Sequence, residues 1–245
     1  MKFENTEVFN FESALRGMRN PKESWEKSDS FYNLPNDSRS SDEYLYGQYV
    51  IGENDLKLAQ TLIKAGSEHR KFMRQIFVSV DITAPLYWWK EFDTYKVGTV
   101  ANSTSTMHKL ASTPITIDCF EMDDFEDVIY EQFETGVEFE GMKELATYKA
   151  SYLWNGLLND LERIRQKYNE TKDKRYWKEL IRLLPESWLQ KRTVTMDYEN
   201  LLAMCSKGQR RFHKLTEWSK SLIDWARSLP YAQELIFIDE VDKCQ

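Results

Sequence analysis

A change in side-chain pattern at residue 83 constrains the fold of this chain more than any other feature. From Ile76 to Ile82 every second residue is apolar, which predicts a strand with one buried face. Thr83 and Pro85 then form a helix-start signal, a hydroxyl cap followed by proline in the first turn, and predict a short aromatic helix to about Phe92. The chain therefore combines strand and helix.

Apolar residues at a spacing of three to four predict helices elsewhere. These helices are expected at about residues 13–20, 54–66, 142–168, 176–184 and 212–229. Residues 114–120 and 192–196 look extended, and Asp197 can cap a helix to about Ser206. The acidic segment 123–140 is typical of a solvated surface.

No internal repeat and no Pro- or Gly-rich linker divides the chain. We therefore predict one α+β domain over residues 51–240, in which helices outnumber strands. Residues 1–50 show little periodicity and are expected to form an N-terminal segment that packs on this domain, with a mobile loop near 35–43.

Composition argues against several classes of function. A net charge of -7 and a pI near 5.2 argue against a general nucleic-acid binder, which needs many Lys and Arg. No run of about 18 apolar residues exists, so we expect no membrane span. Three widely spaced cysteines fit reduced thiols in a cytoplasm, and the three histidines show no zinc-site spacing with them.

The segment after the aromatic helix is rich in small hydroxyl and amide side chains. It contains Lys96, Gly98 and a run of Ser, Thr and Asn up to Thr106. Hydroxyls, amides and backbone N–H groups beside a lysine suit an anionic ligand with many acceptors, such as a nucleotide phosphate. The same composition is typical of an ordinary surface loop, and both interpretations stay open at this point.

Two stretches carry an ordered set of motifs. The first comprises Gly66-Ser-Glu-His-Arg-Lys-Phe-Met-Arg74, the strand 76–82, Thr83-Ala-Pro85 and the helix that leads into 94–106. The second comprises Leu184-Pro-Glu-Ser187, then 193–202 and 210–218. Together, over about residues 50–235, they resemble the flavin-dependent thymidylate synthase (ThyX) family. In that family a Glu-His pair, a strand and a helix lead into an Arg-His-Arg motif followed by spaced serines and an arginine.

The chain departs from the family pattern at the Arg-His-Arg motif. Thr94-Tyr95-Lys96 stands at that position, with Thr99 and Thr104 at the two serines and Thr106 at the final arginine. Two fixed positive charges are thus lost. Lys96 remains, and a lysine offers a point charge where arginine offers a bidentate fork.

The resemblance implies an α+β fold, a ThyX-like single domain with a central antiparallel or mixed sheet flanked by long helices. It also implies a cytoplasmic homotetramer that binds FAD and reductively methylates dUMP or a related pyrimidine nucleotide, with NADPH and methylene-tetrahydrofolate as co-substrates. In such enzymes the cofactor performs the hard step while protein groups bind and orient. The missing arginines leave an alternative open: a non-catalytic nucleotide-binding or assembly protein on the same scaffold.

Candidate site residues follow from the resemblance. The expected flavin contacts are His69, Lys96, Thr99 and Asn102, and the expected nucleotide contacts are Ser103, Thr104, Ser105, Arg210 and Arg211. Exposed or helix-capping roles are the ordinary alternative for each of them. Trp88 and Trp89 could stack on a flat ring, but core packing is expected. The apolar stripe 212–229 is likewise expected to be core.

Overall fold

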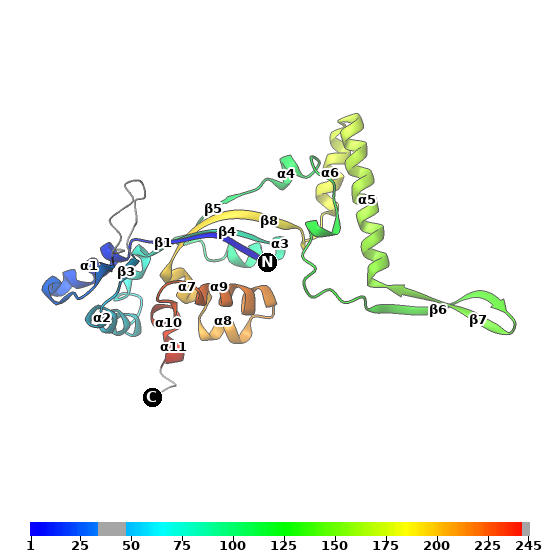
Figure 1. The fold of residues 1–245 in the computed structure, drawn as a ribbon. Helices are drawn as coiled ribbons and strands as arrows, with labels where there is room; N and C mark the ends of the chain where they lie inside the picture. The colour runs from blue at the N-terminus through cyan, green and yellow to red at the C-terminus, as the bar shows by residue number, and fades with distance from the viewer. Residues whose placement is uncertain (34–47, 242–245) are drawn as a thin grey trace, which may run out of the picture. The chain divides into compact units, whose positions relative to one another are not determined.

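The computed structural model describes residues 1–33 and 48–241 (Figure 1). The chain divides into two compact units. The first contains residues 1–83, 88–102 and those from 192 onward, and the second contains 84–87 and 103–191. The loop expected at 35–43 lies outside the described residues, and the single domain stays a prediction. None of the described helices is long and apolar enough to cross a membrane.

A four-stranded sheet has the strand order β1-β4-β8-β5, so β1 and β5 are its edges. The strands are β1 Lys2–Phe9, β4 Phe77–Pro85, β8 Leu189–Asp197 and β5 Val100–Ser103. β1 pairs antiparallel with β4. In β4, Val78, Val80 and Ile82 are fully buried, which confirms the strand predicted from the period-two pattern.

The helix predicted to start at Thr83 begins later than expected. Thr83 is paired with β1 in the sheet, which keeps it extended, and β4 continues to Pro85. The helix α3 then covers Leu86–Phe92. The expected core packing of Trp88 and Trp89 is confirmed, because these side chains are 0% and 1% exposed.

The remaining helices of the first unit are short. They are α1 Phe11–Arg19, α2 Glu53–Lys64, α7 Tyr198–Met204, α8 Lys207–Phe212, a π-helix Glu217–Leu222, α9 Ile223–Arg227, α10 Ala232–Leu235 and α11 Ile238–Val241. Short 3-10 turns cover Asn20–Lys22, Trp25–Lys27 and Lys71–Gln75, and a small hairpin pairs β2 Phe31–Asn33 with β3 Gln48–Val50.

The single helix predicted over 212–229 is wrong. The chain becomes extended at His213, so α8 ends at Phe212 and the π-helix begins at Glu217. Phe212 is 75% exposed and does not belong to the apolar stripe, whereas Trp218 and Leu222 are fully buried. The His213 ring stacks on Trp218 at 4.9 Å, which stabilises the break in the helix.

A buried ion pair ties the N-terminal segment to α2. The Arg19 Nε donates to the Asp55 carboxylate at 2.6 Å, and the side chains are 4% and 0% exposed. The Ser28 and Ser30 hydroxyls donate to the other carboxylate oxygen at 2.6 and 2.5 Å. Both oxygens of the Asp55 carboxylate therefore accept hydrogen bonds, which offsets the cost of burying it.

The second unit combines a long β-hairpin with a pair of helices (Figure 1). The hairpin pairs β6 Ile129–Phe139 with β7 Met142–Lys149, and we call it the arm. Two helices follow, α5 Ala150–Thr171 and α6 Lys174–Leu183. A short helix α4 Thr106–Lys109 and a 3-10 turn Ile117–Cys119 precede the arm. The core is small and includes Leu110, Ile115, Phe120, Leu161 and Leu180.

Two predictions for the second unit are corrected. The helix predicted from Met142 starts at Ala150, because residues 142–149 pair with the acidic segment to form the arm. Residues 114–120 are not a strand: only Phe120 makes an isolated antiparallel bridge, to Trp188. The acidic segment is exposed where its side chains are described, as expected.

Candidate functional site

The start of α7 fixes the loop that contains Lys96. Asp197 and Asn200 form a capping box, in which each side chain accepts a hydrogen bond from the backbone N–H of the other. The Asn200 amide also donates to the Val97 carbonyl at 2.6 Å. Gly98 has φ +83, and a Cβ there would lie 2.7 Å from the Asp197 Oδ2. Glycine is therefore required at this turn.

The charges around this helix start are largely paired. Asp197 is 5% exposed, and burial raises the pKa of its carboxyl above the ordinary value. The neighbouring Glu199 accepts from Arg70 at 3.0 Å and from Arg74. Both of these guanidinium groups therefore serve the structure of α7 in the described chain.

Thr94, Tyr95 and Lys96, which stand at the Arg-His-Arg position, have side chains in different environments. The Thr94 hydroxyl donates to the Glu91 carbonyl at 2.7 Å. The Tyr95 ring stacks on the buried Trp218 at 5.4 Å, and burial raises the pKa of its hydroxyl. Lys96 is exposed. Of the three, Lys96 alone carries a cation at the surface.

Thr99 and Asn102 continue this segment in the first unit. The Thr99 hydroxyl donates to the Tyr95 carbonyl at 2.9 Å, which is the loop-capping alternative for that residue. Asn102 is exposed on the edge strand β5. Ser103, Thr104 and Ser105 belong to the second unit, where the Thr104 N–H donates to the Lys191 carbonyl at 2.8 Å.

Arg210 stabilises the C-terminal end of the chain. Its guanidinium donates to the Cys205 carbonyl and to Asp239 at 2.8 Å, and it lies 3.3 Å from Glu240. Arg211 is exposed beside Phe212, with the guanidinium carbon 5.6 Å from the ring centroid. Arg211 is thus the more accessible of the two.

His69 lies on an exposed turn closed by hydrogen bonds to the Gly66 carbonyl. It lines a hollow of about 410 Å³ together with Lys22, Lys71 and Phe72, among others. Trp88 and Trp89 are 0% and 1% exposed, so neither ring presents a face at the surface for a ligand to stack on.

Arg192 and His213 each approach a carboxylate in this region, and neither contact was predicted from the sequence. The Arg192 guanidinium lies over the Trp89 ring at 4.2 Å and pairs with Asp93 at 2.8 Å. The His213 Nε2 lies 3.7 Å from the Glu91 carboxylate. Glu91 and Asp93 directly follow the Trp-Trp pair and are visible in the sequence, but Arg192, the partner of Asp93, lies 99 residues away.

Within residues 1–33 and 48–241, no group of His, Cys, Asp and Glu could hold a metal ion. Burial raises the pKa of the Cys205 thiol to about 12, which makes it a poor nucleophile.

Comparison with known proteins supports the fold. No protein-family model matches the sequence, and neither does any curated protein. Two crystal structures of ThyX from Helicobacter pylori, both with FAD and dUMP, match with a TM-score of 0.61 at 14% and 13% identity. Each alignment covers 98% of this chain and 99% or 98% of the other. This chain therefore has the α+β fold seen in flavin-dependent thymidylate synthases.

Proposed function

We propose that this protein is a thymidylate synthase-like flavoenzyme that binds FAD and reductively methylates dUMP or a related pyrimidine nucleotide. The observation that carries the proposal is the likeness to structures containing FAD and dUMP over 98% of the chain. The proposal includes NADPH and methylene-tetrahydrofolate as co-substrates, and a cytoplasmic homotetramer.

The segment around Lys96 fits an anionic ligand. The Lys96 ammonium group has no hydrogen-bond or ion-pair partner among the described residues, and the turn that follows it is held by Asn200. Asn102 offers an amide donor and acceptor from an edge strand. An ammonium group such as that of Lys96 suits a phosphate. An amide such as that of Asn102 suits the polar edge of a pyrimidine or flavin ring.

Each residue has a binding role in this proposal. FAD, when bound, supplies the hydride chemistry of the reaction. Lys96 holds a phosphate as a point charge, Arg211 adds a second cation, and Ser103, Thr104 and Ser105 donate to the nucleotide. The capping box keeps Lys96 in place, and His69 contacts the flavin.

Flavin and nucleotide titrations of the full-length protein test this proposal. We expect yellow protein after FAD addition, a rise in melting temperature with dUMP, and dUMP-dependent NADPH oxidation. Lys96→Ala should weaken FAD binding about tenfold, through loss of a charge-assisted hydrogen bond to a cofactor phosphate. Lys220→Ala is the matched control, because Lys220 is also an exposed lysine of the first unit. Protein that takes up no flavin and shows no shift with dUMP would disprove the proposal.

A second function, nucleotide binding without catalysis, is favoured by two contacts. Tyr95 packs against the core at the position of the family's histidine, and Arg210 is committed to Asp239 and Glu240. In that case dUMP raises the melting temperature, but NADPH is not oxidised at any concentration of FAD and folate.

A further inference from the structure

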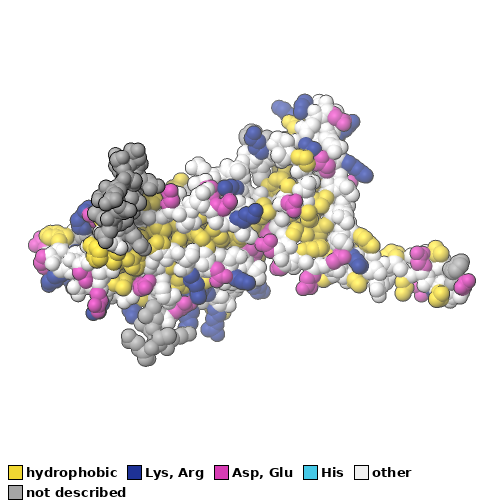
Figure 2. Space-filling view, in the orientation of Figure 1, with side chains coloured by type: hydrophobic (Ala, Val, Ile, Leu, Met, Phe, Trp, Pro, Cys, Tyr) yellow, Lys and Arg dark blue, Asp and Glu magenta, His cyan; other side chains and the backbone are white. Residues whose placement is uncertain are grey.

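Charge is strongly segregated within the second unit. Residues 123–149, which contain the arm, carry nine Asp or Glu and two Lys, a net charge of -7 that equals that of the whole chain. Residues 163–182, at the far end of α5 and in α6, carry eight Lys or Arg and three Asp or Glu, a net charge of +5. Figure 2 shows magenta side chains over the arm and dark blue ones around that end of the helices.

One face of the arm combines aromatic rings with carboxylates. Strand register places Phe133 opposite Ala146 and Glu131 opposite Tyr148, so these side chains share a face. The Tyr130 and Tyr148 rings are 6.1 Å apart. Tyr130, Phe133 and Tyr148 are 58%, 48% and 41% exposed.

The described chain leaves this face open, which a hairpin of this kind tolerates poorly. An isolated two-stranded hairpin is at best marginally stable in water. Exposed apolar groups gathered on one surface mark contact sites. The arm therefore needs a covering surface that accepts aromatic rings and is positively charged.

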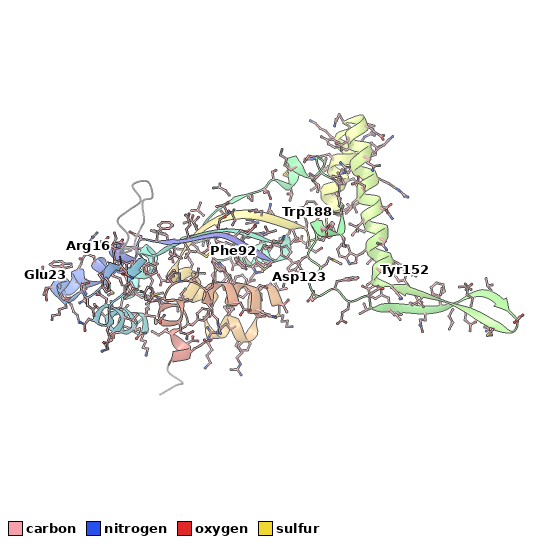
Figure 3. All side chains as sticks on the ribbon, viewed as in Figure 1. Arg16, Glu23, Phe92, Asp123, Tyr152 and Trp188 are labelled. Atoms are coloured by element: carbon pink, nitrogen blue, oxygen red, sulfur yellow. The ribbon has the colours of Figure 1, made fainter. Side chains whose placement is uncertain are left out.

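The exposed side of α5 has the features of such a surface. Tyr152 and Leu153 are 56% and 52% exposed, and Tyr152 lies near the start of the helix (Figure 3). Gly156, one turn further, is exposed, and a Cβ there would meet no atom within 4 Å. Glycine inside a helix is destabilising relative to alanine, and it permits close approach of another backbone.

We propose that the arm packs on α5 and α6 of a second copy of this chain. A two-fold arrangement places the acidic arm of each copy along the α5 of the other, toward its basic end, and buries both aromatic faces. The lengths agree: 22 helical residues of α5 span about 33 Å, and 11 residues of β6 span about 36 Å. This inference names a contact for the proposed self-assembly, and it does not depend on the proposed flavin and nucleotide chemistry, because no flavin or nucleotide contact enters it.

A charge exchange tests the pairing in the full-length protein. Glu131 on the arm and Lys178 on α6 are exposed, and neither forms an ion pair within the described residues. Sedimentation velocity over a concentration series should show a dimer or larger assembly whose dissociation constant rises about tenfold in Glu131→Lys and in Lys178→Glu. The double exchange should restore most of the affinity, and added NaCl should weaken the wild-type assembly.

Gly156 provides a second test that leaves the arm intact. Gly156→Ala should keep or raise the melting temperature, whereas Gly156→Trp should abolish the assembly while the circular dichroism spectrum is retained. A monomer at all concentrations would overturn the proposal, as would an assembly that Glu131→Lys, Lys178→Glu and Gly156→Trp all leave unchanged. An arm that binds only an unrelated basic protein would also overturn it. Flavin uptake, measured on the same samples, separates this outcome from failure of the proposed function.

Discussion

Two ion pairs of nearly equal length lie in very different surroundings. Arg19 and Asp55 are 2.6 Å apart with side chains 4% and 0% exposed, whereas Lys143 and Glu134, on the arm, are 2.8 Å apart and 61% and 56% exposed. Serine hydroxyls complete the hydrogen bonds of Asp55, and nothing similar surrounds the pair on the arm in the described structure. The first unit buries this ion pair and supplies its hydrogen bonds internally, while the arm presents polar and apolar groups outward.

Removing Asp55 should have the largest effect. Asp55→Ala leaves the buried Arg19 without its carboxylate, and we expect the free energy of unfolding to fall by about 3–5 kcal/mol in urea denaturation. Asp55→Asn should lose less, because the amide oxygen still accepts hydrogen bonds. A loss below about 1 kcal/mol for the alanine variant would show that the pair does not stabilise the N-terminal segment.

Two glycines extend the comparison to the backbone. Gly98 and Gly136 have similar left-handed φ values, +83 and +79, but a Cβ at Gly98 meets Asp197 whereas a Cβ at Gly136 meets nothing within 4 Å. Alanine at either position costs about 1 kcal/mol of strain, and Gly98→Ala should cost a further 1–2 kcal/mol or so from the clash. Equal melting temperatures for the two variants would contradict the packing of this turn on α7.

The pH dependence of unfolding should respond to a carboxylate in the helices of the second unit but not to one in the arm. Hydrogen bonds from Arg165 hold the pKa of the Glu162 carboxyl at about 2, against an ordinary 4.5, despite its partial burial. Because the folded-state pKa is lowered, this stabilisation is present above pH 4.5 and is lost as the pH falls toward 2. Glu162→Gln should flatten the pH dependence of unfolding over that range, followed by near-ultraviolet circular dichroism, whereas Glu131→Gln should leave it unchanged.

Sequence patterns predicted those elements whose apolar residues are buried. The alternation in β4 and the Asp197 cap of α7 were both visible, because local geometry determines them. The arm was missed because its apolar residues are exposed and follow no buried period, so the helix spacing that begins at Leu153 was extended backward into β7.

The candidate site was predicted only in part for a related reason. Lys96 was identified from its own segment, and the structure leaves it exposed. The partners of Arg210 and Arg192 lie 29 and 99 residues away, and only the folded chain shows that these guanidinium groups are already paired. The sequence thus shows where charged residues stand, but not which of their charges remain available for a ligand after folding.

The smallest effect is expected at the pair on the arm. Lys143→Ala removes an exposed ion pair with Glu134, on the face opposite Phe133, and should change the free energy of unfolding by about 0.5 kcal/mol or less in urea denaturation. Raising the salt concentration should erase even this difference, since exposed charges are screened, whereas the loss caused by Asp55→Ala should persist in salt. A change above about 2 kcal/mol in the Lys143 variant would mean that a contact from another chain covers this second face as well, and the arm would then be enclosed rather than laid on a single helix pair.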